Sequence, residues 1–185
     1  ESDLATYYQE IKYNIFSVPF DIEQRTFGEP RLLIDAESIG MSALLPRISP
    51  DGRYLLFSMA EYGTFHIWHK NSDLYLLDFQ NNTIRSLEEV NSKDTESYHS
   101  WSSNGRWMVF SSRRDDGSYT RPYIAYFDEQ GRAGKPFILP QKDPDFHLDF
   151  LKSYNIPEFM KEPVGISPRK FARTLKGDAI QAVMR

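Results

Sequence analysis

The sequence contains no cysteine, which excludes disulfide bonds, thiolate metal ligands and a cysteine nucleophile. No apolar run approaches the ~20 residues that a membrane-spanning helix needs. The first residues are polar and show neither a Met start nor a signal-peptide pattern, which predicts a processed or trimmed chain. The net charge of −4 argues against a nucleic-acid surface. We therefore expect a globular chain with no membrane span and no nucleic-acid partner.

Aromatic residues, in contrast, are abundant. The chain has 11 Tyr, 13 Phe and 3 Trp, which together make 15% of its residues, and 11 Pro and 10 Gly interrupt it often. Short aromatic-rich runs separated by turn residues are typical of proteins with many β-strands.

An internal repeat supports this prediction. The run Ile48–Ser58 recurs as Trp101–Ser111, 53 residues later. Each copy contains a turn dipeptide, Asp51-Gly52 or Asn104-Gly105, of the kind that favours a two-residue hairpin turn with positive φ at both central positions. Each copy therefore predicts a strand, a tight turn and a second strand.

A second shared element follows each copy. An apolar run at 73–79 or 121–128 is followed by a turn and by a short strand at 83–87 or 135–139. Four strands in a unit of roughly 45–50 residues are typical of a β-propeller blade. The segments 14–21 and 28–34 match the last two strands of such a unit, so they predict half of an earlier blade.

The predicted fold class is therefore all-β, with about two and a half four-stranded antiparallel blades and a short helical C-terminal tail. The propeller part spans residues 1–140, and the tail spans 141–185. Within the propeller part we expect a half blade at 13–35, a blade at 44–88 and a blade at 98–140. The eight strands of the two full blades are expected near 44–49, 53–58, 73–79 and 83–88, and near 98–103, 106–112, 121–128 and 135–140.

The run Ser49–Ser58, Ser-Pro-Asp-Gly-Arg-Tyr-Leu-Leu-Phe-Ser, resembles the WD40-like repeat of TolB-type β-propellers. The resemblance covers residues 13–140, and similar runs occur in prolyl-oligopeptidase propellers. The second copy departs from the pattern, because Ser103-Asn104 replaces Pro-Asp. The resemblance implies a non-catalytic interaction module of the bacterial cell envelope, periplasmic or associated with the outer membrane.

The tail differs in composition from the rest of the chain. Residues 1–150 hold 15 Lys and Arg against 23 Asp and Glu, a net charge of −8, whereas residues 151–185 hold 7 against 3, a net charge of +4. The run Asp143-Pro144-Asp145 predicts a helix start, with an apolar face of Phe146, Phe150, Leu151 and Tyr154, and a second short helix is expected within 169–184. A basic tail on an acidic body predicts that the two pack together; a lipid- or partner-binding tail is the alternative.

Two and a half blades cannot close a ring, since propellers have at least ~4 blades. A terminal blade face is therefore expected to be covered. The tail is the first candidate, through Phe146, Phe150, Leu151, Tyr154, Phe159 and Phe171, and a homodimer or association with further blades is the second.

Patterns for catalysis or metal binding are weak. The run 40–44, Gly-Met-Ser-Ala-Leu, lacks the last Gly of a nucleophile elbow and precedes a strand. His66 and His69 could approach each other, but a zinc site needs a further ligand. The alternating Asp143, Asp145, His147 and Asp149 are explained by the helix start. We expect no enzyme activity, no cofactor and no metal.

The predicted binding surface follows from blade topology. The loops at 59–72 and 113–120 lie on one rim of a propeller, and loops on a rigid scaffold often carry binding. Their aromatic and Arg side chains suit protein or peptide contacts, and His99 is expected at the channel mouth. The candidate partner-binding residues are Tyr62, Phe65, His66, Trp68, His69, His99, Arg113, Arg114 and Tyr119. The predicted function is non-catalytic protein or peptide binding; the alternatives are an accessory propeller of a hydrolase whose catalytic domain lies outside this chain, and a glycan-binding propeller.

Overall fold

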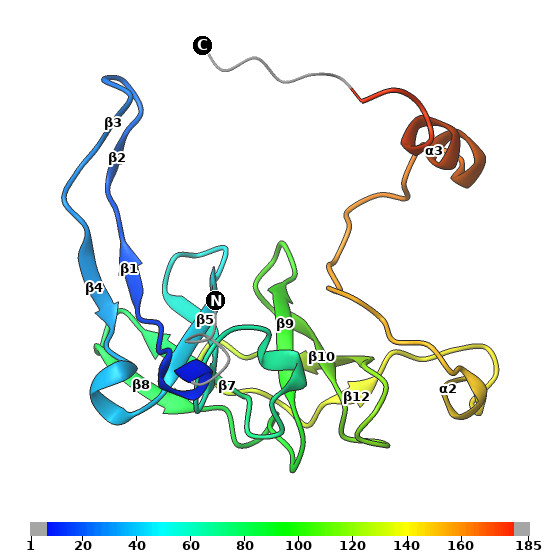
Figure 1. Ribbon diagram of the computed structural model, residues 1–185, viewed down its shortest axis with the longest axis horizontal. Helices are drawn as coiled ribbons and strands as arrows, with labels where there is room; N and C mark the ends of the chain where they lie inside the picture. The colour runs from blue at the N-terminus through cyan, green and yellow to red at the C-terminus, as the bar shows by residue number, and fades with distance from the viewer. Residues whose placement is uncertain (1–6, 180–185) are drawn as a thin grey trace.

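The computed structural model describes residues 7–179 and consists mainly of β-strands (Figure 1). Two four-stranded antiparallel sheets follow each other along the chain, and each has its strands in sequence order. The prediction of all-β propeller blades is therefore confirmed. The first blade consists of β5 (Ser42–Ile48), β6 (Tyr54–Ala60), β7 (Asp73–Asp78) and β8 (Thr83–Ser86). The second blade consists of β9 (Glu96–Trp101), β10 (Trp107–Ser112), β11 (Arg121–Tyr126) and β12 (Phe137–Ile138).

The half blade forms one long hairpin that projects from the blades (Figure 1). Its inner part pairs Ile15 with Ile34, and its tip pairs Phe20 with Phe27. Pro19, which has no N–H to donate, lies at the break between the two parts. The four strands of the hairpin are β1 (Ile15–Ser17), β2 (Phe20–Asp21), β3 (Thr26–Phe27) and β4 (Arg31–Ile34).

The blades stack face to face through alternating apolar side chains. On one face of β6, Leu56 packs with Met108 and Phe110 of the second blade. On the opposite face, Leu55 and Phe57 pack with residues of the half blade. The strand β6 is buried along its whole length because neighbouring sheets cover both of its faces.

The turns between the first two strands of each blade differ from the predicted two-residue type. The N–H of Gly52 donates to the carbonyl of Ser49 at 2.9 Å, and the N–H of Gly105 donates to Ser102 at the same distance. Only the glycines have positive φ, +74° and +66°, whereas the Asx residues before them do not. Pro50 stands second and Gly52 fourth, the order that a four-residue type I turn favours. The prediction of positive φ at both central positions was therefore wrong.

Each innermost strand contains a bulge at the equivalent repeat position. Leu45 and Tyr98, which are 53 residues apart, have φ of +57° and +49°, and the strand register shifts beside both. The ring of His99, the residue after the second bulge, places Nε2 2.7 Å from the carbonyl oxygen of Leu45 and 3.2 Å from that of Leu56. Because both partners accept, Nε2 carries the proton, and His99 joins the two blades.

The tail covers the outer face of the second blade only in part. Backbone carbonyls of the segment 152–157 accept hydrogen bonds from Ser111, Ser100 and Arg121 at 3.3, 3.2 and 3.0 Å. The segment is thus held by polar contacts rather than by the predicted apolar side chains. Residues 158–179 are all exposed. Phe159, at 38%, lines shallow pockets beside Trp101 and Ser102 of the second blade. The expected cover by Phe171, at 59%, is wrong because the helix Pro168–Leu175 stands apart from the blades (Figure 1).

Between residues 141 and 179, the part of the tail that the structure describes, two α-helices form, α2 (Phe146–Asp149) and α3 (Pro168–Leu175). Asp145 rather than Asp143 occupies the N-cap position of α2, and the helix ends after four residues. Three short 3₁₀ helices lie elsewhere, at Tyr8–Glu10, Glu37–Ile39 and His66–Trp68. None of the helices in the described range is long and apolar enough to cross a membrane.

Candidate functional site: the loop rim

Two loops on the same rim of the blades form the candidate site. The loop 61–72 connects β6 to β7, and the loop 113–120 connects β10 to β11. We call these two loops together the loop rim. The opposite rim carries the four-residue turns, and we call it the turn rim.

The loop 61–72 is held to the blades from inside. His66 is 1% exposed, its Nδ1 lies 3.1 Å from the hydroxyl of Ser58, and its Nε2 lies 3.2 Å from the carbonyl oxygen of Gly63. Thr95 of the next blade donates to the carbonyl of His66 at 2.9 Å. Burial lowers the pKa of His66 to about 4, so the ring is neutral near pH 7. These contacts hold the backbone of the loop 61–72 in place, so its exposed side chains have fixed positions on the rim.

The aromatic side chains of this loop point outward. Phe65, at a positive φ of +55°, is 68% exposed, and Trp68 is 65% exposed. The guanidinium carbon of Arg113 lies 5.1 Å from the centre of the Trp68 ring, a cation–π contact between the two loops. Arg113 thus supports the indole while one side of it stays open to solvent.

Two pockets flank the exposed Phe65 and Trp68, which we call the aromatic ridge. One has a volume of about 290 Å³ and is lined by Trp68, Ile67, Tyr98 and the tail residues 153–155. The other has a volume of about 230 Å³ and lies beside Tyr62 and His69, whose ring centres are 4.6 Å apart. Burial lowers the pKa of His69. A protruding Trp between two shallow pockets is suited to side chains of a peptide.

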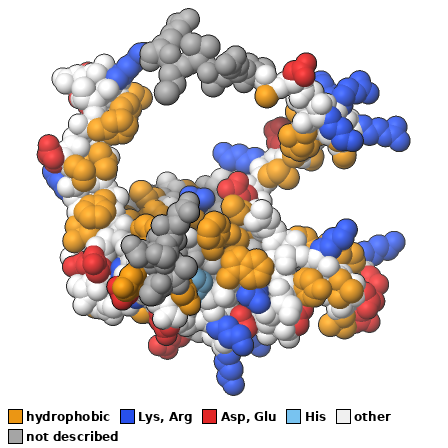
Figure 2. Space-filling view, viewed as in Figure 1, with side chains coloured by type: hydrophobic (Ala, Val, Ile, Leu, Met, Phe, Trp, Pro, Cys, Tyr) orange, Lys and Arg blue, Asp and Glu red, His pale blue; other side chains and the backbone are white. Residues whose placement is uncertain are grey.

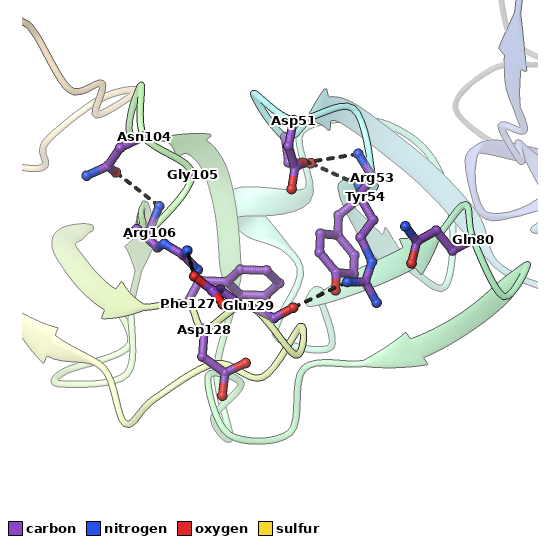
Figure 3. Close-up of a pocket in the computed structure, with 11 residues that line it drawn as sticks. Asp51, Arg53, Tyr54, Gln80, Asn104, Gly105, Arg106, Phe127, Asp128 and Glu129 are labelled. Carbon is purple, nitrogen blue, oxygen red and sulfur yellow. Dashed lines mark hydrogen bonds and ion pairs between the residues drawn. The ribbon is translucent and has the colours of Figure 1, made fainter.

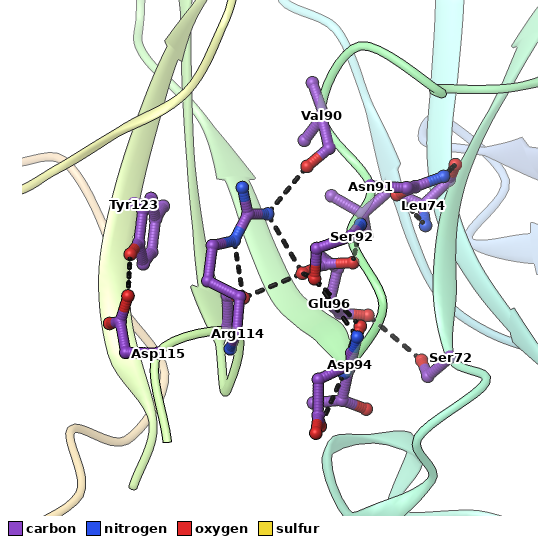
Figure 4. Close-up of polar contacts among 12 residues, drawn as sticks. Ser72, Leu74, Val90, Asn91, Ser92, Asp94, Glu96, Arg114, Asp115 and Tyr123 are labelled. Carbon is purple, nitrogen blue, oxygen red and sulfur yellow. Dashed lines mark hydrogen bonds and ion pairs between the residues drawn. The ribbon is translucent and has the colours of Figure 1, made fainter. Parts of the chain in front are cut away.

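Two predicted site residues, His99 and Arg114, point into the protein instead. His99 joins the blades and is 1% exposed. Arg114 turns away from Arg113 and pairs with the fully buried Glu96 at 2.9 Å (Figure 4). Its guanidinium also lies 4.5 Å from the centre of the Tyr123 ring. The six that gather on the loop rim are Tyr62, Phe65, His66, Trp68, His69 and Arg113, with His66 as their internal anchor. Tyr119, on the same rim, lies against Arg121 instead, with that guanidinium carbon 5.2 Å from its ring centre.

Tyr98 and Tyr154 line the rim but were not predicted. Tyr98 occupies the bulge of β9, where its positive φ turns the side chain out of the regular strand alternation. The equivalent position in the first copy is Leu45, so the repeat alone marks the position without showing the bulge. Tyr154 arrives from the tail, and no local pattern predicts that approach.

The turn rim holds a separate cavity of about 490 Å³ between the two blades (Figure 3). Among its charged lining residues, Arg106 and Glu129 pair with each other. Arg53 and Asp128, in contrast, pair with residues outside the lining, Arg53 with Asp78 at 3.1 Å and Asp128 with Arg132. In the part of the chain that the structure describes, no three His, Asp or Glu side chains are grouped as metal ligands, and His66 and His69 therefore stay without a third one.

Similarity to known proteins is found among solved structures. No family model and no curated protein matches the chain. It is similar to TolB-type β-propellers of known structure. TolB from Acinetobacter baumannii is 20% identical with a TM-score of 0.42, over 68% of this chain and 27% of that one. The β-propeller domain of the Trilobed protease from Pyrococcus furiosus is 18% identical with a TM-score of 0.40, over 71% and 36%. A putative TolB from Agrobacterium tumefaciens is 21% identical with a TM-score of 0.34, over 54% and 30%. The chain thus spans 27% to 36% of the length of these solved chains.

Proposed function

We propose that this chain is a non-catalytic β-propeller module that binds a protein or peptide on its loop rim, within the bacterial cell envelope and in the periplasm or at the outer membrane. The observation that carries the proposal is Trp68, which is 65% exposed and is supported from one side by Arg113. Trp and Arg are enriched among the residues that dominate binding energy at protein interfaces.

The pockets beside the ridge favour a peptide-like partner. Each is shallow, and aromatic side chains line both of them, with hydroxyl and amide groups of the tail at the edge of one. Such a surface accepts one or two apolar side chains and hydrogen-bonds the backbone between them. The loop is anchored by His66 and Thr95, so little ordering is needed when a partner binds.

Substitution of Trp68 tests the proposal. We expect Trp68→Ala to reduce the recovery of partners from envelope extract at least about tenfold, because an interface Trp contributes ~2 kcal/mol or more. Its thermal unfolding should stay near that of the wild type, since the side chain is mostly exposed. Quantitative mass spectrometry of the captured proteins measures the change.

The matched control is Phe27→Ala, which removes an aromatic side chain that is 75% exposed but lies on the projecting hairpin. It should capture the same proteins as the wild type. Equal recovery with wild type, Trp68→Ala and Phe27→Ala would move the binding surface away from the loop rim.

A further inference from the structure

The helix α3 stands apart from the blades (Figure 1). Its residues are all exposed, and so is the chain that leads to it from residue 158. Local contacts define its ends: the hydroxyl of Ser167 accepts from the N–H of Lys170 at 3.3 Å, and Pro168 occupies the first turn. The helix is therefore formed by its own sequence and not by packing on the body.

The two sides of α3 differ sharply in chemistry. At 3.6 residues per turn, Phe171 and Leu175 lie one turn apart on one side, with Ala172 at its edge. The remaining side carries only basic and hydroxyl groups, and the stretch 168–176 contains no acidic residue. Figure 2 shows Lys and Arg side chains spread around this helix, with hydrophobic side chains gathered beneath them. The basic residues are Arg169, Lys170, Arg173 and Lys176.

The apolar side continues into the chain before the helix. Met160, Val164 and Ile166 are 67%, 64% and 49% exposed, and Phe171 and Leu175 are 59% and 72% exposed. These side chains are spread along an extended segment and a short helix, so they form an elongated, shallow apolar strip and not one compact apolar patch. A shallow apolar strip bordered by Lys and Arg matches the boundary between acyl chains and headgroups of a bilayer.

We propose that the segment 160–176 binds the surface of an anionic lipid bilayer. Phe171 and Leu175 enter the headgroup boundary, while the four basic residues of the helix lie beside lipid phosphates. The acidic body, with a net charge of −8 over residues 1–150, stays in water on the far side of the extended linker. This placement explains why the segment 160–176, which has a net charge of +4, lies away from an acidic body that would attract it.

Vesicle sedimentation of the full chain tests this inference. We expect the partition coefficient on phosphatidylglycerol vesicles to exceed that on phosphatidylcholine vesicles at least about tenfold, because an anionic surface attracts each of the Lys and Arg residues beside it. The double variant Phe171→Ser/Leu175→Ser should lose most of this partition. It should unfold like the wild type, since α3 contacts no blade residue. The control Ile22→Ser/Phe27→Ser changes two exposed apolar residues of the hairpin and should partition like the wild type.

Two results would overturn the inference. One is equal partition of the wild type on both kinds of vesicle, or none on either. The other is a concentration-dependent dimer, seen by light scattering without lipid and abolished by Phe171→Ser/Leu175→Ser, which would identify a second copy of the chain as the partner of α3.

Discussion

Replacing Arg114 with Ala is expected to lower the free energy of unfolding by about 3–5 kcal/mol, because it leaves a buried carboxylate without its counter-charge. Glu96 is fully buried and accepts from Arg114 at 2.9 Å, from the hydroxyl of Ser112 at 2.7 Å and from the N–H of Ser92 at 2.9 Å (Figure 4). Arg114 also donates to the carbonyl of Val90 at 2.6 Å. Urea unfolding measures the loss.

The neighbouring Arg113 supplies the control. Its guanidinium bonds only to backbone carbonyls within the described residues and stacks on the exposed Trp68. Arg113→Ala should cost less, about 1.5–3 kcal/mol, the range for hydrogen bonds with one charged partner, because no buried carboxylate loses its counter-charge. If Arg114→Ala unfolds at the same urea concentration as the wild type, Glu96 is not held by this pair and the second blade is organised differently.

Acidification from pH 6.5 to pH 4 is expected to destabilise the protein through its buried histidines. Burial lowers the pKa of both His66 and His99 to about 4. In this window the unfolded chain binds protons that the folded chain does not, so stability falls as the pH falls. Each ring contributes roughly 1.4 kcal/mol per pH unit, and roughly 3 kcal/mol over the window. Well above pH 6.5 both histidines are neutral in the folded and the unfolded chain, so no stability is lost through them.

Asp73 acts in the opposite direction. Burial, together with the nearby Glu96, raises its pKa to about 6, so the folded chain takes up this proton before the unfolded chain does. Asp73→Asn should therefore steepen the acid loss, whereas His99→Gln, which keeps an N–H donor, should flatten it. Urea midpoints between pH 7 and pH 4.5 measure both slopes. An unchanged slope for His99→Gln would show that this ring is already charged in the fold or is exposed.

The blades could be predicted from the sequence because residues close together in the chain determine each of their hairpins. The turn glycines and the apolar alternation around Leu56 and Phe110 each act within a single hairpin, and the repeat at an interval of 53 residues shows the same hairpin twice. The turn type was wrong because glycine stands fourth in both turns, so only that residue has a positive φ, and the second copy forms the same turn with Ser103 where the first has Pro50. The bulges at Leu45 and Tyr98 depend on contacts between blades and leave no residue-type signal.

The position of the two rim loops was predictable from the sequence, but the direction of each side chain was not. The long loop marked Phe65 and Trp68 correctly as rim residues. Adjacent residues such as Arg113 and Arg114, however, face opposite sides where a strand ends, and composition does not show which one meets a buried Glu. Tyr154 reaches the rim only because the tail crosses the second blade, a contact between segments 34 residues apart along the chain.

Amide hydrogen exchange on the chain, alone and loaded with the proteins that the wild type captures from envelope extract, tests the central claim most directly. The loop-rim account predicts slower exchange in the loaded state over residues 61–72 and 113–120. It predicts little change at the turn rim, over residues 49–54 and 102–107. Protection confined to the turn rim, with unchanged exchange in both loops, would contradict it.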